Sequence, residues 1–348
     1  MRAWMVGEFG PFRQVLRLQE RPLPASAPRP GDGPGGASVP SRSPDRAAGA
    51  LVRVEAADVN FPDLLLIAGA YQLRPELPFT PGFAAAGRVE QADPDHTLAV
   101  GDRVVCPLLY GGFQEYLRVQ ARDAFPIPAA MSAAVAVAFF LSFQTAWFAL
   151  VRQARLRPGE VLLVHGGAGG VGAAAIQLGK VLGAEVVATA RGEDKCAASR
   201  LLGADHALDS ATQDFVAAVR QITGGRGADV VFDPVGGDLF ERSTKCIAWE
   251  GRILPIGFAS GTIPSIGANR ILFKNIAVVG MYWTSYWQHA PEDVRRVHSE
   301  LVELHGQGRI APLIHREYPF ELLPRALAAV ERREIRGKAV LTMNGEGT

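Results

Sequence analysis

The stretch from residue 161 to residue 180 reads VLLVHGGAGGVGAAAIQLGK and decides the fold of its half of the chain. An apolar run enters a glycine-rich turn, and the turn opens directly into a segment of helix-forming residues. Gly167, Gly169 and Gly172 have the spacing G-x-G-x-x-G. In that pattern the glycines permit a tight turn, close approach of a pyrophosphate and close packing of helix against strand. The stretch therefore predicts a strand, a phosphate-binding loop and a helix.

The start of the predicted helix supplies the binding chemistry. Its first amides have no partner within the helix and lie at the positive end of the helix dipole, where phosphate is favoured. A glycine-rich turn of some other α/β protein is the alternative, but the flanking strand and helix favour a dinucleotide site. The residues expected to contact the cofactor here are Gly167, Ala168, Gly169, Gly170, Val171 and Gly172.

The end of the next strand distinguishes the two nicotinamide dinucleotides. Arg191 follows the run EVVATA at 185–190, where an NAD site usually carries a carboxylate for the ribose 2′-hydroxyl. Arg191 and Lys195 are both suited to a 2′-phosphate, which Arg can bind bidentately. In the opposing interpretation Glu193 or Asp194 binds the ribose, although neither acid stands at the strand end. NADP(H) is therefore the predicted cofactor.

Strands and helices alternate from residue 158 to about residue 290, which predicts a doubly wound parallel sheet. The expected strands are 161–164, 185–190, 206–208, 230–233, 252–257 and 276–281. The preceding part has short strands near 51–56, 86–90, 103–107 and 113–119, which are typical of a compact, mostly antiparallel β domain. The predicted fold class is therefore α/β, with two domains.

Composition and charge limit the classes of function. The 348 residues are 48% hydrophobic and 20% charged, with a net charge of +1, which is ordinary for a two-domain α/β enzyme. Lys and Arg form no run, which argues against nucleic acid or an anionic membrane as the main partner. Cys106, Cys196 and Cys246 stand singly, as expected for a cytoplasmic protein without a cysteine zinc site.

The N-terminus and the longest apolar segment also lead us to expect a cytoplasmic protein. The first ten residues contain no apolar core of the signal-peptide type. Segment 133–151 approaches the length of a membrane span, yet it contains Ser142, Gln144 and Thr145 and leads directly into the nucleotide-binding half. We expect a buried connecting helix whose N-cap is Ser132.

Motifs along nearly the whole chain, apart from residues 22–49, resemble the medium-chain dehydrogenase/reductases, specifically their zinc-independent quinone oxidoreductase branch with the zeta-crystallins. Besides the glycine loop, the matching motifs include ADVNFPD at 57–63, PFTPG at 78–82, VGDRV at 100–104, GAD at 203–205, TGGRG at 223–227, FDPVGG at 232–237, IGFASG at 256–261 and GK at 337–338. The resemblance implies a GroES-like substrate domain, a Rossmann domain, an active-site cleft between them and usually a homodimer.

The resemblance and the composition together suggest domain boundaries. Residues 1–130 are expected to form the GroES-like domain, in which 22–49, rich in Pro, Gly and Ser, is a flexible surface loop. Residues 131–290 are expected to form the Rossmann NADP-binding domain. Residues 291–348 are expected to return to the substrate domain.

The resemblance also locates the positions at which zinc-dependent relatives carry metal ligands. Asn60 stands at the first cysteine position, and Gly-Phe-Ala at 82–84 replaces a Gly-His-Glu segment, so no thiolate and imidazole set remains for a catalytic zinc. The chain also departs from the quinone oxidoreductase pattern. Asp58 replaces the usual Gly, Phe83-Ala84 replaces a Ser-Glu-like pair, and Ser210 replaces a Tyr near the adenosine.

The resemblance assigns two candidate catalytic residues. It places Asn60 near the nicotinamide as a donor to the substrate oxygen, with turn capping as the alternative. It places Tyr71 beside the cleft, with core packing as the alternative. Lys338 is expected to anchor the last strand.

Four further residues are placed near the cofactor by the resemblance, namely Thr145, Gly257, Phe258 and Arg333. The alternatives are hydrogen bonding within a helix for Thr145, core packing for Phe258 and a solvated charge for Arg333. The run MYWTSYW at 281–287 either walls a pocket for a flat substrate or fills a dimer interface.

Without a metal or an evident acid–base pair, the predicted enzyme needs an acceptor that takes hydride readily. We expect hydride transfer from NADPH to a quinone or another conjugated carbonyl compound, with the protein supplying orientation, water exclusion and hydrogen-bond donors. The alternatives are an enoyl-thioester reductase and an NADPH-binding protein with a structural or sensing role.

Overall fold

The computed structural model describes residues 1–24, 49–93 and 97–343, so residues 25–48 of the predicted flexible loop lie outside the described part. The chain forms two compact units, one of Met1–Leu141 with Ile314–Thr348 and the other of Ser142–Leu313. The sequence placed the divisions after residues 130 and 290. In the structure the units divide after residues 141 and 313, and the helix α10 (Pro291–Gly306) lies with the second unit.

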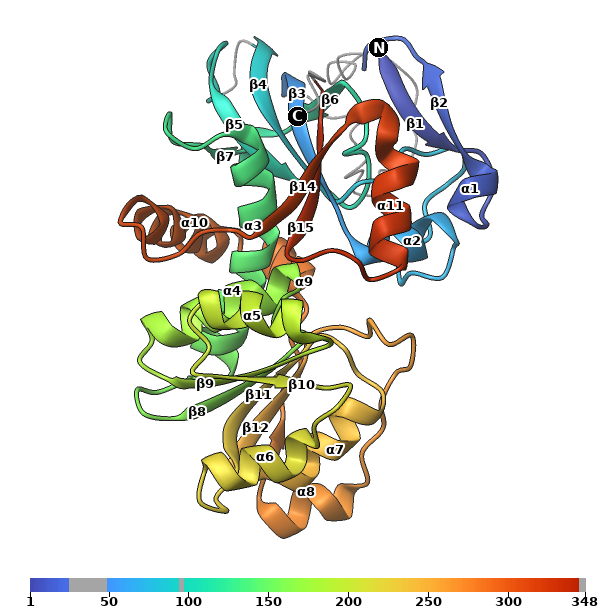
Figure 1. The fold of residues 1–348 in the computed structure, drawn as a ribbon. Helices are drawn as coiled ribbons and strands as arrows, with labels where there is room; N and C mark the ends of the chain where they lie inside the picture. The colour runs from blue at the N-terminus through green and yellow to red at the C-terminus, as the bar shows by residue number, and fades with distance from the viewer. Residues whose placement is uncertain (25–48, 94–96, 344–348) are drawn as a thin grey trace. The chain divides into compact units, whose positions relative to one another are not determined.

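The second unit is built on a parallel six-stranded sheet with the order β10-β9-β8-β11-β12-β13, which confirms the predicted Rossmann architecture (Figure 1). Figure 1 shows α4 and α5 on one face of the sheet and α6, α7 and α8 on the other. The strands are β8 (Val161–His165), β9 (Glu185–Ala190), β10 (His206–Asp209), β11 (Ala228–Asp233), β12 (Ile247–Pro255) and β13 (Ala277–Val278). The helices are α4 (Gly170–Val181), α5 (Glu193–Leu201), α6 (Phe215–Ile222), α7 (Asp238–Cys246), α8 (Ala268–Lys274), α9 (Trp283–His289) and α10.

The first unit is built on a mostly antiparallel sheet, which confirms the predicted GroES-like half. The strands are β3 (Ala50–Val59), β4 (Ala84–Ala92), β5 (Arg103–Pro107), β6 (Tyr116–Val119), β7 (Phe125–Pro126), β14 (Ile314–Pro319) and β15 (Lys338–Thr342), with β1 (Arg2–Val6) and β2 (Leu16–Glu20) as a separate hairpin. The helices are α1 (Phe12–Val15), α2 (Phe61–Ile67) and α11 (Leu323–Glu331).

The last strand returns to the first unit, as predicted. β15 pairs antiparallel with β3, so that Val340 lies opposite Asp58 and Ala339 opposite Val59. β15 also pairs in parallel with β14. Apolar side chains of these strands fill a core together with α2 and α11, and this core fixes the start of β15 beside the end of β3.

The apolar segment 133–151 is a helix, as expected. α3 spans Ala133–Trp147 and continues as a π-helical segment, Phe148–Gln153. The Ser132 hydroxyl accepts the backbone N–H of Val135 at 3.1 Å, which is the predicted N-cap. Within the described residues this is the one helix long and apolar enough to cross a bilayer, and 78% of its apolar window is buried inside the molecule. That burial is what a core helix requires.

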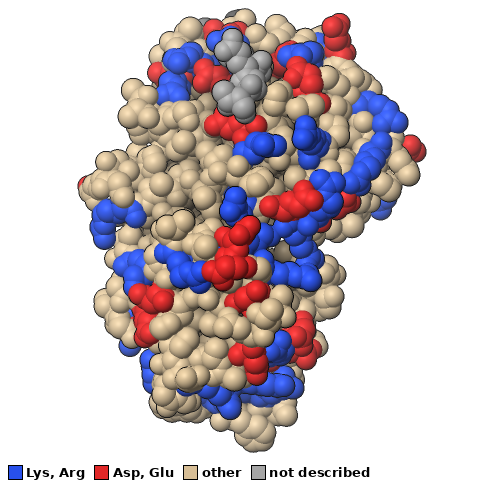
Figure 2. Space-filling view, viewed as in Figure 1, with Lys and Arg blue, Asp and Glu red and all other residues tan. Residues whose placement is uncertain are grey.

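Charged side chains are mixed over the surface in view. Figure 2 shows Lys and Arg interspersed with Asp and Glu, as a net charge of +1 allows. Many of them form exposed pairs, such as Arg332 with Glu334 and Arg296 with Asp293. Exposed pairs of this kind contribute little to stability.

Candidate functional site

The glycine loop joins β8 to α4 and leaves amides available at the helix start. The loop turns at Gly166, whose φ is +62°, and it is tied to β9 by the N–H of Gly167, which donates to Thr189 O at 2.9 Å. The first intrahelical bond runs from Ala173 N–H to Gly169 O at 2.8 Å. The amides that precede this bond belong to Gly170, Val171 and Gly172, and they form the positive end of α4.

Two of the loop glycines are required by close packing. A Cβ on Gly172 would lie 2.2 Å from the carbonyl oxygen of Gly166. A Cβ on Gly167 would lie 2.9 Å from Ala188 Cβ and 2.9 Å from Ser199 Oγ. The helix therefore starts directly against the loop backbone, as the G-x-G-x-x-G spacing predicts.

The end of β11 lies beside the loop. Oδ1 of Asp233 accepts the N–H groups of Val235 (2.8 Å) and Gly236 (2.9 Å), which fixes the turn after the strand. A Cβ on Gly166 would contact Val235 and Pro234 at 3.4 and 3.7 Å. Because β8 and β11 are neighbours with opposite winding directions, this is the switch point at which open parallel sheets bind ligands.

The segment after β12 packs on the same turn. A Cβ on Gly257 would lie 3.3 Å from the carbonyl oxygen of Pro234. A Cβ on Gly236 would lie 3.1 Å from the ring of Phe258. The structure thus brings the predicted cofactor residues Gly257 and Phe258 to the strand end next to the glycine loop.

A buried histidine links three elements under the loop. His165 Nδ1 is 2.8 Å from Thr189 Oγ1, and Nε2 is 2.7 Å from Ser243 Oγ. Because Ser243 donates to Leu239 O, His165 donates through Nε2 and accepts at Nδ1. Burial lowers the pKa of His165, so the ring is held neutral between β8, β9 and α7. The sequence did not reveal this network.

The end of β9 carries the predicted 2′-phosphate residues. Arg191 is exposed, and the N–H of Gly192 next to it donates to Asp209 Oδ1 at 2.9 Å. Backbone hydrogen bonds, first that from Gly192, lower the pKa of Asp209. Lys195 lies in the first turn of α5. The carboxylate of Asp209 therefore keeps the turn after β9 in place, and the charge of the exposed Arg191 lowers the pKa of Asp209 further.

One of the two acids of the opposing interpretation is engaged elsewhere. Glu193 pairs with Arg200 two turns along α5. Asp194 is exposed in the first turn of the helix, where a negative charge is favoured by the helix dipole. Glu193 is thus directed along its own helix, which favours Arg191 over Glu193 as the group that meets the ribose.

Thr145 is buried in α3, in the same unit as the loop. Its neighbour Gln144 donates to Val294 O at 3.0 Å and accepts from Trp283 Nε1 at 3.5 Å. The end of α3 is therefore packed against α9 and α10.

The aromatic run at 281–287 has a role that neither sequence interpretation included. Trp283 and Trp287 are buried and stacked on each other, with ring centroids 5.8 Å apart. Tyr286 stacks on Phe148 at 4.2 Å. Three of the four aromatic rings thus pack α9 inside the second unit, and Tyr282 is the exposed one at 49%.

Asn60 begins α2 in the first unit. Its N–H donates to Asp63 Oδ2 at 2.7 Å, in a capping box. Burial is the largest cause of a pKa of Asp63 raised well above its ordinary value, which its hydrogen bonds from Asn60 and Gly82 partly oppose. Lys338 Nζ contacts Asn60 Oδ1 and the carboxylate of Asp58. The turn-capping alternative for Asn60 therefore holds for its backbone and extends to its side chain, whose Nδ2 donates to the Asp58 carbonyl oxygen at 3.4 Å.

The remaining sequence candidates also lie in the first unit. Tyr71 is partly buried and meets Phe83 edge to face, with ring centroids 5.3 Å apart. Arg333 is exposed, with a φ of +57°, in the turn after α11. Asn60, Tyr71 and Arg333 thus belong to one unit, and the other candidate residues belong to the second.

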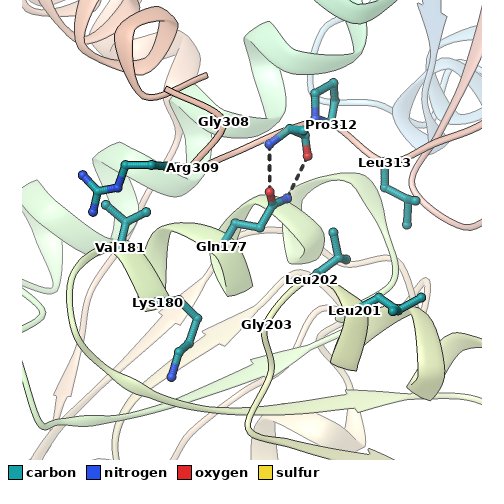
Figure 3. Close-up of a pocket in the computed structure, with 11 residues that line it drawn as sticks. Gln177, Lys180, Val181, Leu201, Leu202, Gly203, Gly308, Arg309, Pro312 and Leu313 are labelled. Carbon is teal, nitrogen blue, oxygen red and sulfur yellow. Dashed lines mark hydrogen bonds between the residues drawn. The ribbon is translucent and has the colours of Figure 1, made fainter. Parts of the chain in front are cut away.

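A hollow of about 580 Å³ lies at the C-terminal end of α4, away from the glycine loop (Figure 3). Gln177 and Ala311 form part of the wall of this hollow and are joined by two hydrogen bonds. The side-chain amide of Gln177 donates to Ala311 O and accepts from Ala311 N–H, each at 2.8 Å. Lys180 on its rim is bound to Asp205. Across residues 1–24, 49–93 and 97–343, no group of three or more His, Cys, Asp or Glu side chains is arranged to hold a metal ion.

A G-x-G-x-x-G loop at the switch point of a parallel sheet, joined to a GroES-like β unit, defines a two-domain nucleotide-dependent dehydrogenase fold. The comparisons agree with this class. Residues 46–129 match the family model of the alcohol dehydrogenase GroES-like domain, and residues 170–303 match that of zinc-binding dehydrogenases. The chain is 36% identical over 295 residues to a quinone oxidoreductase-like protein 2 homolog of Nematostella vectensis, covering 83% of this chain and 80% of the relative.

Two solved structures have the same fold. Quinone oxidoreductase of Escherichia coli, complexed with NADPH, superposes with a TM-score of 0.86 and 27% identity over 98% of this chain and all of that one. A mycobacterial protein complexed with NADPH superposes with a TM-score of 0.87 and 29% identity over 98% of this chain and 99% of that one. The chain belongs to the quinone oxidoreductase branch of the medium-chain dehydrogenase/reductase superfamily.

Proposed function

We propose that this chain is an NADPH-dependent oxidoreductase that reduces a quinone or another conjugated carbonyl compound. The observation that carries the choice of cofactor is the turn after β9. Arg191 stands exposed at the strand end, with Lys195 one turn on, while Glu193 is paired with Arg200. Cations at this position suit a 2′-phosphate. Related structures in complex with NADPH support the same choice.

The loop fits the pyrophosphate of a dinucleotide. The space that a Cβ on Gly172 would fill is taken by the Gly166 carbonyl, so the helix start stays close to the loop. The amides of Gly170, Val171 and Gly172 then face an anion. When bound, NADPH supplies the hydride, and the chain's residues supply the rest of the chemistry.

We assign that remaining chemistry to orientation and hydrogen bonding. Gly257 and Phe258 at the end of β12, with Thr145 of α3, are the proposed contacts to the nicotinamide half, and Arg333 is a further proposed cofactor contact. Asn60 donates from its amide to the substrate oxygen on which negative charge develops. Tyr71, beside Phe83, offers an aromatic surface to a flat substrate.

The test is NADPH oxidation by the purified protein, with NADH alongside, against quinones and conjugated enones in buffer containing EDTA. We expect turnover that prefers NADPH and that EDTA does not change, because Asn60 and residues 82–84 provide no zinc ligands. Tight NADPH binding without turnover on any acceptor would instead support the binding-protein function. Preferential turnover of an enoyl thioester would support the enoyl-thioester reductase.

We also propose that the chain forms a homodimer through the β13 edge of the parallel sheet. β13 is an edge strand, and α8 before it exposes Leu272 (69%) and Phe273 (79%). An exposed apolar edge invites pairing with a second copy. We expect light scattering to give about twice the 37.2 kDa chain mass, and Phe273→Glu to give the monomer. Leu201→Glu, a change at a side chain that is 90% exposed on α5, is the control and leaves the dimer intact.

A further inference from the structure

A buried ion pair lies beside the proposed donor Asn60. Lys338 Nζ is 2.5 Å from Asp58 Oδ2, and the two side chains are 7% and 0% exposed. The strand register brings them together, because β15 begins at Lys338 and runs antiparallel to the end of β3. A buried charge needs such a partner, since an unpaired ammonium or carboxylate is costly inside a protein.

The same ammonium reaches the amide of Asn60. Lys338 Nζ donates to Asn60 Oδ1. An ammonium offers donors only, so it selects the oxygen of a carboxamide and turns the NH₂ group away from itself. The Asn60 backbone is held separately, by the carboxyl oxygen Oδ2 of Asp63. Two buried side chains therefore fix the residue, Lys338 at its side chain and Asp63 at its backbone.

We propose that Lys338 is a positioning residue, held in place by Asp58, that orients the Asn60 amide so that Nδ2 donates to the substrate oxygen. The inference rests on the donor role of Asn60 in the proposed function. One Nδ2 hydrogen is directed at the Asp58 carbonyl oxygen, 3.4 Å away, and the substrate takes the other. Asn60 as a whole is half-buried.

The alternative role of Lys338 is only to neutralise the charge of Asp58. Two variants distinguish this role from the positioning of the Asn60 amide. Lys338→Met removes the donor and leaves Asp58 unpaired, whereas Asp58→Ala/Lys338→Met removes both charges. We expect Lys338→Met to lower kcat about tenfold to a hundredfold, because a reacting group is then misplaced, with KM for NADPH unchanged. In the double variant we expect Tm to recover from the loss in Lys338→Met while kcat stays low. Recovery of kcat together with Tm would overturn the inference.

A second measurement does not depend on turnover. In ¹⁵N-asparagine-labelled protein, the side-chain NH₂ pair of Asn60 is identified by its absence from the Asn60→Asp spectrum. We expect two separate proton resonances in the wild type and a shifted or broadened pair in Lys338→Met. Lys180→Met, which removes another carboxylate-bound lysine, is the control and leaves the pair unchanged.

The two measurements keep the proposals apart. If the wild type fails to oxidise NADPH with every acceptor tested, the proposed function is contradicted. The Asn60 resonances still report on the role of Lys338 in that case. An unchanged Asn60 pair in Lys338→Met overturns the positioning role even if quinones are good substrates.

Discussion

Arg191→Ala is expected to lower kcat/KM for NADPH by about tenfold to a hundredfold, the effect of losing charge-assisted hydrogen bonds to the 2′-phosphate that are worth about 1.5–3 kcal/mol. The value for NADH should change by less than about twofold, because NADH has no 2′-phosphate for the guanidinium to bind. Asp209 holds the turn after β9 through Gly192, so the loop should keep its conformation in the variant. Steady-state kinetics with both cofactors at one ionic strength measures the ratio of kcat/KM for NADPH to kcat/KM for NADH.

The matched control is Arg53→Ala. It removes the same charge from β3 in the first unit, where the exposed Arg53 is paired with Glu90. We expect it to leave the preference for NADPH within about twofold, since screening weakens long-range effects of exposed charges. An equal loss with NADPH and NADH in Arg191→Ala would show that the residue acts on folding or on the common part of the cofactor. An unchanged preference would assign the 2′-phosphate to other residues.

The features that the sequence predicted correctly are local ones. The glycine loop could be recognised because strand, turn and helix are consecutive, and the residues that make the turn are those of the proposed site. The order of alternating strands and helices was sufficient for the parallel sheet, because connections of this kind have one preferred hand. The Ser132 cap was evident for the same reason, since the cap and the amide it accepts are three residues apart.

Features that depend on distant pairings could not be predicted. His165 bonds to Thr189 and Ser243, which are 24 and 78 residues away. Asp58 was noticed only as a departure from a family pattern, and Lys338 only as an anchor, because the register of β15 on β3 is what joins them. The composition of the aromatic run at 281–287 suggested either a pocket wall or a dimer interface, whereas packing against α3 buries Trp283 and Trp287.

Gly172→Ala is expected to abolish measurable NADPH binding. The new Cβ would lie 2.2 Å from the Gly166 carbonyl oxygen and 3.0 Å from Gly167 Cα, all backbone atoms that no rotamer change can move. The helix start must therefore shift away from the loop, and its amides lose their approach to the pyrophosphate. Overpacking of this kind costs about 1–3 kcal/mol of unfolding free energy, so Tm should also fall by several degrees.

Two measurements separate binding from folding in this variant. Gly306→Ala is the control, because Gly306 ends α10 and a Cβ there meets nothing within 4 Å. It should keep both the NADPH dissociation constant, measured by fluorescence titration, and the Tm of the wild type. Far-ultraviolet circular dichroism of Gly172→Ala below its Tm should match the wild type. If folded Gly172→Ala still binds NADPH with a dissociation constant within about threefold of the wild type, the start of α4 does not form the pyrophosphate site, and the cofactor must bind elsewhere on the sheet.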